Sequence, residues 1–298
     1  MTAPILRSML SVPGNQQRFI DKALAVPADI ICFDLEDSVA WDDKPAARDT
    51  VAAALPNFDA RGRLRCVRVN GIETGLAEQD LAAVVGPSLD VVNLPKVYDA
   101  SQIQQADHYL TLLERTRGLE PGAIRLIPWI ETAAAVVNAY EICAASPRIL
   151  AFTFGADDYA TDSGVVRTPD AAELNYPRAA ASNAGAAAGI VPLDTPTTEF
   201  KDLAKFERDL IAARHLGYKG KFCIHPTQVE IANRVFAPTQ DELDWARRII
   251  DAYDVGKAQG RGAIALDGEM IDDPLVDRAH QLLDWTQRVA QRDAELSR

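Results

Sequence analysis

Two short apolar runs decide the fold of this chain: Arg125-Leu-Ile-Pro-Trp-Ile-Glu131 and Ile149-Leu-Ala-Phe-Thr-Phe-Gly-Ala-Asp-Asp158. A run of this length, bounded by Pro and Gly, is typical of a strand buried on both faces, as in a parallel sheet. Residues 132–146 between them have the composition of a helix. The runs are therefore predicted to be successive strands of a βαβ unit, with the acids Glu131 and Asp158 at neighbouring strand ends.

The same alternation of strand and helix continues along residues 1–232. The predicted strands are 8–12, 30–36, 65–70, 91–97, 125–131, 149–155, 189–194 and 221–225. The predicted helices between them include 15–24, 44–54, 75–84, 100–117, 132–146 and 200–216. Eight such repeats indicate an α/β fold, a closed (β/α)₈ TIM barrel. An open doubly wound sheet is the alternative, but no Gly-x-Gly-x-x-Gly follows any predicted strand.

The pattern changes in residues 233–298, which are predicted to form a C-terminal helical extension. One helix is expected over 239–260, opened by the Thr-x-x-Glu box of Thr239 and Glu242. A Gly-rich turn and a short apolar stretch follow, and a last helix is expected over 274–292. An arm of this size is typical of a contact between subunits, so a homo-oligomer is expected.

Composition excludes several classes of partner. The 298 residues carry a net charge of −12, which argues against binding nucleic acid or an anionic membrane surface. The N-terminus lacks the order of a signal peptide, and no apolar run approaches the about 18 residues of a membrane span. The four cysteines are far apart without a Cys-x-x-Cys spacing, so buried reduced thiols are expected. We expect a soluble cytoplasmic protein.

Acidic and basic side chains gather where the predicted strands end. Two convergent carboxylates, Glu131 and Asp158, are suited to hold Mg²⁺, with water and substrate oxygens completing its coordination. Alternatively, each acid caps the helix that follows it, and the whole rim is a solvated face. The remaining ionisable or polar strand ends are Asp34, Glu36, Asp37, Arg68, Asn70, Lys96, Asp194 and His225.

Several segments of the chain together resemble the citrate lyase β-subunit group of the HpcH/HpaI aldolase/citrate lyase family. They are Arg7-Ser-Met-Leu-Ser-Val-Pro-Gly-Asn15, Phe33-Asp-Leu-Glu-Asp-Ser-Val39, Val67-Arg-Val-Asn70, Leu94-Pro-Lys96, Ile130-Glu-Thr132, Phe154-Gly-Ala-Asp-Asp-Tyr159, Pro192-Leu-Asp-Thr195, Gly217-Tyr-Lys-Gly-Lys-Phe-Cys-Ile-His-Pro226 and Gly268-Glu-Met-Ile-Asp272. The resemblance implies a (β/α)₈ barrel, usually a trimer or hexamer, that makes or breaks a carbon–carbon bond beside a thioester.

The activity that the resemblance implies is Mg²⁺-dependent cleavage of a 3-hydroxyacyl-CoA thioester, of the citramalyl-CoA or malyl-CoA type. The products are acetyl-CoA and a 2-keto acid. A related activity is that of a citrate lyase β subunit, which acts on a citryl thioester carried by an acyl-carrier protein. The same motifs are compatible with a malyl-CoA thioesterase or malate synthase-like activity, and with a non-catalytic binding subunit.

The resemblance also assigns the main roles in the site. It makes Glu131 and Asp158 the Mg²⁺ ligands, although Asp157 lies beside Asp158 in the same motif. Arg68 is expected to donate to the thioester oxygen as negative charge grows there, unless it only forms a salt bridge on the rim. Asp272, which in CoA-dependent relatives reaches a neighbouring subunit's site, is the expected general acid. Its alternative role is an N-cap before the last helix.

Further rim residues have supporting roles in this prediction. Glu36 and Asp37 are expected either to hold metal-bound waters or to orient Arg68, and Lys96 to pair with them or orient substrate. The turn at Pro13, Gly14 and Asn15 offers backbone N–H groups to a substrate carboxylate or phosphate. It is alternatively an ordinary turn in which Asn15 caps a helix.

Overall fold

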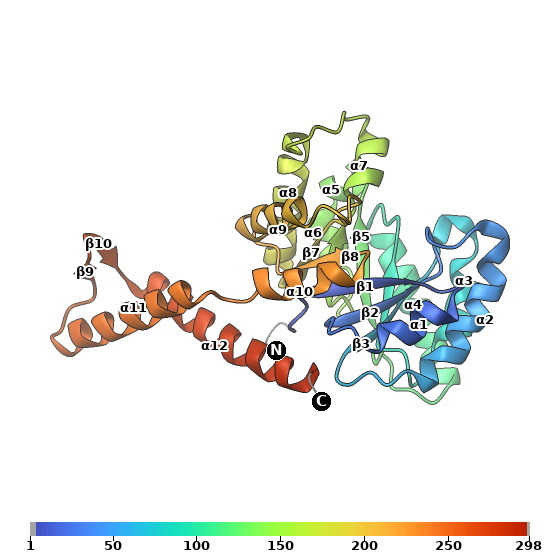
Figure 1. Ribbon diagram of the computed structural model, residues 1–298, viewed down its shortest axis with the longest axis horizontal. Coiled ribbons are helices and arrows are strands. Elements are labelled where there is room, and N and C mark those ends of the chain that lie inside the picture. Colours follow the sequence, from blue (N-terminus) through green and yellow to red (C-terminus); the bar gives the residue numbers. More distant parts are fainter. Residues whose placement is uncertain (1–3, 297–298) are drawn as a thin grey trace. The chain divides into compact units, whose positions relative to one another are not determined.

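The computed structural model of the protein describes residues 4–296 (Figure 1). It divides into two compact units, one that runs to Phe236 and one that begins at Ala237. The division falls a few residues after the expected boundary at 232, because helix α10 (Pro226–Val235) belongs to the first unit.

The first unit is a closed barrel of parallel strands. Each strand pairs with the next, and β8 pairs back with β1 through Ser8 and Lys221. The (β/α)₈ prediction is therefore confirmed. The strands are β1 (Ser8–Pro13), β2 (Ile30–Asp34), β3 (Leu64–Arg68), β4 (Val91–Leu94), β5 (Arg125–Ile130), β6 (Ala151–Phe154), β7 (Val191–Asp194) and β8 (Gly220–Cys223).

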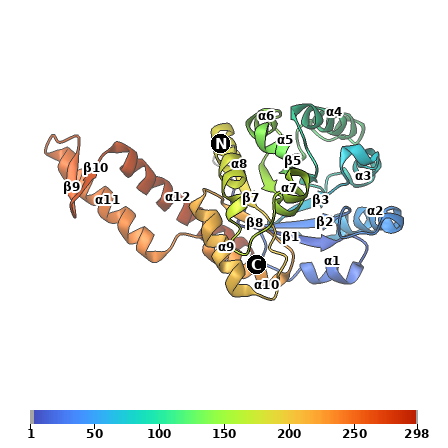
Figure 2. The same cartoon turned by 90° about the horizontal axis from the view of Figure 1, so that it is seen from above.

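Helices surround the barrel, as Figure 2 shows. The prediction of a single helix over 132–146 is wrong in one respect. Asn138 leaves the helical conformation (φ −92°, ψ 11°), so this segment forms two helices. The Asn138 side chain donates to the carbonyl of Tyr98. The two resulting helices are α5 (Ala133–Val137) and α6 (Ala139–Ala144). The other helices of this unit, besides α10, are α1 (Gln17–Ala23), α2 (Lys44–Ala54), α3 (Ala77–Val84), α4 (Ala100–Thr116), α7 (Ala156–Ser163), α8 (Asn175–Ala188) and α9 (Leu203–His215).

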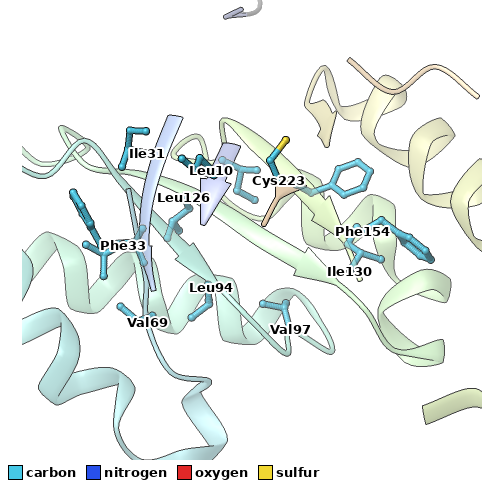
Figure 3. Close-up of a cluster of buried hydrophobic side chains, with 14 of the residues drawn as sticks. Leu10, Ile31, Phe33, Val69, Leu94, Val97, Leu126, Ile130, Phe154 and Cys223 are labelled. Atoms are coloured by element: carbon cyan, nitrogen blue, oxygen red, sulfur yellow. The ribbon is translucent and has the colours of Figure 1, made fainter. Parts of the chain in front are cut away.

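Alternation along the strands builds two apolar cores. On β2, Ile31 and Phe33 belong to the large cluster that also contains helix side chains such as Val51 (Figure 3). Ile30 and Cys32 belong to a smaller cluster of strand side chains. Because successive side chains of a strand point to opposite faces, this second set fills the barrel interior. Asp34, two residues after Cys32, therefore points inward at the end of its strand.

Arginine–carboxylate pairs join the strands where they begin. Arg7, just before β1, pairs with Asp29 just before β2, both being at most 1% exposed. Arg65 at the start of β3 pairs through Nε and Nη2 with Asp90. A third pair, Arg148 with the buried Glu114, lies just before β6. The opposite end of the barrel, where the strands finish, is called the C-terminal rim below.

The second unit is a helical hairpin with a small β-hairpin at its turn. Helix α11 (Gln240–Ala258) is followed by β9 (Ile264–Leu266), β10 (Glu269–Ile271) and helix α12 (Asp273–Leu296). Its apolar core includes Ile249, Tyr253 and Ile271. The sequence prediction missed β9 and β10, although Asp267-Gly268 between them is a strong hairpin signal. Both residues have positive φ (52° and 87°), as a type I′ turn requires.

Two expectations drawn from composition can be compared with the structure. All four cysteines are buried and free, as expected. Within residues 4–296, no helix combines the length and apolar character needed to cross a membrane.

Candidate active site at the C-terminal rim

A buried ion pair between Asp34 and Arg68 forms the centre of the rim. The two residues end β2 and β3 and are partners in the strand register. Arg68 Nε lies 2.7 Å from Asp34 Oδ1, and Nη2 lies 2.6 Å from Oδ2. Burial alone would raise the pKa of Asp34, but the charge and hydrogen bonds of Arg68 outweigh it and lower that pKa. The guanidinium is thus fixed by a bidentate contact, which gives it one orientation.

The loop after β2 is wound around the same carboxylate. Asp34 also accepts hydrogen bonds from the backbone N–H groups of Glu36 (2.9 Å) and Ser38 (3.1 Å). From the other side, the buried Lys44 Nζ donates to the carbonyls of Leu35 and Glu36, both at 2.9 Å. Lys44 therefore stabilises the loop that presents the acids.

Glu36 and Asp37 surround the remaining part of the guanidinium. Arg68 Nη1 lies 3.0 Å from Glu36 Oε2 and 3.3 Å from Asp37 Oδ2. Lys96 Nζ lies 3.3 Å from Glu36 Oε1, so the predicted pairing of this lysine with the acids is present. Burial raises the pKa of Glu36 to about 7, against the opposing charge of Arg68. The predicted rim salt bridges of Arg68 therefore exist. The second N–H of Arg68 Nη2 has no partner within residues 4–296.

Glu131 follows β5 and is 3% exposed. Its Oε1 accepts a hydrogen bond of 2.6 Å from the backbone N–H of Lys96, which has the unusual φ of +53°. Such a left-handed conformation at a non-glycine residue is strained and concentrates at functional sites. Burial raises the pKa of Glu131 to about 8, and the negative charge of Asp158 adds to the effect. The charge of Asp158 therefore acts on Glu131, as expected of two carboxylates on the same rim.

Of the two neighbouring acids on α7, Asp158 belongs to the rim. Partial burial, with the charge of Asp37, raises the pKa of Asp158, while Lys96 and Arg68 oppose the rise. The adjacent Asp157 instead forms an ion pair with Arg167. This contact engages Asp157 away from Glu131, which favours Asp158 as the predicted metal ligand.

The donor set fits a hard divalent cation. Within residues 4–296, no three His, Cys, Asp or Glu side chains are placed to hold a metal ion by themselves. Two carboxylates can do so when water and substrate oxygens complete the coordination. The charges of the rim favour a cation as well: with all acids ionised, five carboxylates face three cationic side chains, which leaves two negative charges in excess. These groups are Asp34, Glu36, Asp37, Glu131 and Asp158, with Lys44, Arg68 and Lys96.

The turn after β1 differs from its expectation. The N–H of Gly14 is not available to a substrate, because it donates to the carbonyl of Asp34 at 2.9 Å. Pro13 ends β1, and the residue before helix α1 is Gln16, so Asn15 is not the helix cap. Among residues 4–296, the buried Oδ1 of Asn15 has no hydrogen-bond partner, and the role of Asn15 in substrate binding stays a prediction.

Two other strand ends have structural roles. Asp194 is fully buried between Lys221 (2.6 Å) and Arg178 (2.9 Å). His225 accepts a hydrogen bond from the N–H of Thr227 and thereby caps α10. The sequence prediction placed Asp34 at a strand end without a catalytic or metal-binding role, and it gave no role to Lys44 or Thr195. The sequence signals for them were positional: Asp34 ends a strand, Thr195 directly follows one, and Lys44 begins the helix after β2.

Asp272 lies in the second unit, directly after β10. Its carbonyl accepts hydrogen bonds from the N–H groups of Leu275 and Val276, so it stands at the start of α12, where its alternative role as a cap would place it. Its side chain is half-buried. Its role as general acid stays a prediction.

Replacing Gly155 by alanine is expected to disturb the site. An added Cβ would lie 2.5 Å from both Cβ and Oε2 of Glu131, so the carboxylate must move. Overpacking of this kind costs about 1–3 kcal/mol in the free energy of unfolding, and displacing the predicted ligand Glu131 is expected to weaken Mg²⁺ binding. Urea unfolding with and without Mg²⁺ measures both effects. Gly86→Ala is the control, because its Cβ would meet nothing within 4 Å; equal behaviour of the two variants would contradict the prediction.

A closed parallel barrel with fixed ionisable groups where its strands end defines the (β/α)₈ class of enzyme. Residues 7–226 match the family model HpcH/HpaI aldolase/citrate lyase. The chain belongs to this family, as its motifs had predicted.

Three similar proteins illustrate the range of the family. Citrate lyase subunit beta of Leuconostoc mesenteroides subsp. cremoris is 38% identical over 277 residues, covering 93% of this chain and 92% of that protein. L-malyl-CoA/beta-methylmalyl-CoA lyase of Cereibacter sphaeroides is 34% identical, covering 93% of each. The crystal structure of CitE from Mycobacterium tuberculosis in complex with magnesium, acetoacetate and coenzyme A has a TM-score of 0.77. It is 28% identical and covers 96% of this chain and 98% of that one.

Proposed function

We propose that this protein is a Mg²⁺-dependent carbon–carbon lyase that cleaves a 3-hydroxyacyl-CoA thioester of the citramalyl-CoA or malyl-CoA type. The products would be acetyl-CoA and a 2-keto acid. The observation that carries the proposal is a guanidinium fixed by Asp34 on the same rim as two carboxylates, Glu131 and Asp158, whose pKa values are raised. The names of the similar proteins, which include lyases of such thioesters, support it.

Glu131 and Asp158 are the residues that would hold Mg²⁺. When bound, the ion would offset the excess negative charge of the rim and polarise the carboxylate and hydroxyl oxygens of the substrate. Lys96 supports this arrangement through its N–H to Glu131 and its Nζ to Glu36. Glu131 is therefore oriented before substrate arrives.

Arg68 stabilises the charge that develops on the thioester. Cleavage breaks the carbon–carbon bond and leaves its electron pair on the acetyl fragment, so the thioester oxygen becomes negative as the enolate forms. The hydroxyl carbon becomes the carbonyl of the keto acid, and the hydroxyl proton passes to solvent water. The unpartnered N–H of Arg68 can donate to the thioester oxygen, while Asp34, Glu36 and Asp37 hold the guanidinium in place. A preorganised donor of this kind is worth about 3–4 kcal/mol of the barrier.

Asp272 is the proposed acid that protonates the enolate carbon. Asp272→Asn is expected to lower kcat by about 10²-fold, the lower part of the range for general acid catalysis, with a small change in KM. The adjacent Asp273→Asn is the control, since Asp273 accepts a hydrogen bond from Tyr253 Oη in the core of the second unit. Steady-state kinetics of both variants test the role. Equal activity of Asp272→Asn and the wild type would remove Asp272 from the mechanism.

The proposal is tested by incubating the purified protein with Mg²⁺ and (S)-citramalyl-CoA, then with malyl-CoA, and following keto acid and free thiol separately. Keto acid without thiol on one substrate would establish the lyase and name its acyl group. Thiol release as well would indicate thioester hydrolysis, as in a thioesterase or malate synthase. Binding without turnover of any thioester would indicate a non-catalytic subunit.

The second candidate is the β subunit of a citrate lyase, acting on a citryl thioester of acyl-carrier protein. The 38% identity to citrate lyase subunit beta over nearly the whole chain favours it. Activity on citryl-acyl-carrier protein, with none on either CoA thioester, would select this function.

Assembly and location are further parts of the proposal. The second unit is proposed to contact a neighbouring copy in a homotrimer or hexamer, in the cytoplasm. Light scattering after size exclusion, with and without residues 237–298, tests the oligomer.

A further inference from the structure

Helix α7, which carries Asp158, has no side-chain cap of its own. Its N-cap residue is Gly155, which has no side chain to accept a hydrogen bond from the first turn. A larger residue cannot replace it without moving Glu131, because a Cβ would lie 2.5 Å from Glu131 Oε2. The close approach of Glu131 thus leaves the first turn of α7 to be capped from elsewhere.

Thr195 on the neighbouring strand end provides this contact. Its Oγ1 accepts a hydrogen bond of 2.9 Å from the N–H of Ala156, the first residue of α7. Thr195 is 8% exposed and directly follows Asp194. Because Asp194 is held by Lys221 and Arg178, the backbone that carries the Thr195 hydroxyl is itself fixed.

No hydrogen bond to another described residue sets the position of the Asp158 side chain. It is the third residue of α7, where an acid often bonds back to the N–H of the N-cap residue. Here the N–H of Gly155 donates to the carbonyl of Ile130 instead, at 3.1 Å. Within residues 4–296, the Asp158 side chain has no hydrogen bond or ion pair. Its carboxylate is therefore available to a ligand, and only the backbone of the first turn determines where it lies.

We propose that Thr195 is a positioning residue for the divalent cation site: its hydroxyl fixes the first turn of α7 and so sets the distance from Asp158 to Glu131. The inference rests on the proposed function, in which these two acids hold the metal. Loss of a side chain that orients a metal ligand typically weakens metal binding by about 10–100-fold. Thr195→Val keeps the shape and removes only the acceptor, so about tenfold weaker binding is expected.

Mn²⁺ is the probe, because carboxylate and water ligands suit it as they suit Mg²⁺ and its free concentration is measured by electron paramagnetic resonance. The full chain, without substrate, is titrated as wild type, Glu131→Gln, Thr195→Val, Thr195→Ala and Thr195→Ser. Thr239→Val is the matched control, since Thr239 Oγ1 caps helix α11 by accepting from the N–H of Glu242. Urea unfolding without metal accompanies each titration.

Thr195→Val and Thr239→Val are both expected to lower the midpoint of urea unfolding. Among the threonine variants, only Thr195→Val and Thr195→Ala, which lack the Thr195 hydroxyl, should weaken Mn²⁺ binding. Thr195→Ser should bind within about twofold of the wild type, because it keeps the acceptor. Wild-type affinity in Thr195→Val and Thr195→Ala would overturn the inference, as would equally weak binding by Thr195→Ser. In those cases the metal site itself stands. No Mn²⁺ binding by the wild type would overturn the metal site and, with it, the role of Thr195.

Discussion

Glu131→Gln is expected to abolish the stabilisation of the protein by Mg²⁺ and to reduce lyase activity to background. Glu131 is buried beside Gly155 and receives the N–H of Lys96, so an amide can occupy the same space. It cannot supply the charge that holds the cation. At a Mg²⁺ concentration 100 times the dissociation constant, the wild type should gain about 2.7 kcal/mol of unfolding free energy, and the variant nothing.

The control is Glu230→Gln, an exposed glutamate on α10, which should respond to Mg²⁺ as the wild type does. Chemical unfolding with Mg²⁺ and with a chelator measures the difference. If Glu131→Gln gained as much stability from Mg²⁺ as the wild type, Glu131 would not be a ligand.

Without metal, Glu131→Gln should be more stable than the wild type, by an amount that depends on pH. The pKa of Glu131 is raised from 4.5 to about 8 in the folded protein, mainly by burial. The folded state therefore holds the proton more tightly than the unfolded chain, and the wild type loses stability as pH rises through this window. Glutamine has no proton to lose. In chelator, the advantage of Glu131→Gln should grow from about pH 4.5 to pH 8 and stay constant above it.

Arg68→Lys is expected to lower kcat by about 10³-fold, equivalent to about 4 kcal/mol of the barrel site's transition-state stabilisation. Lysine keeps the charge but cannot span both oxygens of Asp34 and still direct an N–H at the substrate. KM should change little, because the lost contact is made mainly to charge that develops during the reaction.

Arg65→Lys is a matched control on the same strand. Arg65 makes the same two-atom contact, with Nε and Nη2 to Asp90, at the opposite end of β3. Arg65→Lys should lose less stability than Arg68→Lys, because its ion pair is partly exposed, and it should keep its kcat. Steady-state kinetics beside urea unfolding separates the two effects. A similar loss of kcat in both variants would mean that Arg68 acts only through the fold.

The fold was predictable because the barrel strands are short, apolar and separated by helices of ordinary length. The ends of the predicted strands place Glu131 and Arg68 on one rim, since parallel strands of a barrel finish at the same end. Local details that depend on one residue's conformation were missed, such as the break at Asn138. The Asp267-Gly268 hairpin was missed although its turn signal is present in the sequence.

The finer arrangement of the site depends on contacts between distant segments. The choice between Asp157 and Asp158 depends on the rotation of α7 and on the contact of Asp157 with Arg167. The use of the Gly14 N–H depends on the approach of β2 to the end of β1. Thr195 reaches Ala156 across two neighbouring strands. No local pattern in the sequence encodes these distances.

The arginine–carboxylate pairs at the beginning of the strands have a consequence for how this protein can evolve. Arg7 with Asp29, Arg65 with Asp90 and Arg148 with Glu114 join neighbouring segments at the end of the barrel opposite the rim. Mutations far apart in a structure usually have additive effects on stability. Substitutions that adapt the rim to a new acyl group therefore leave this end intact. A change of acyl-group specificity in this chain therefore need not reduce the stability that these three pairs supply.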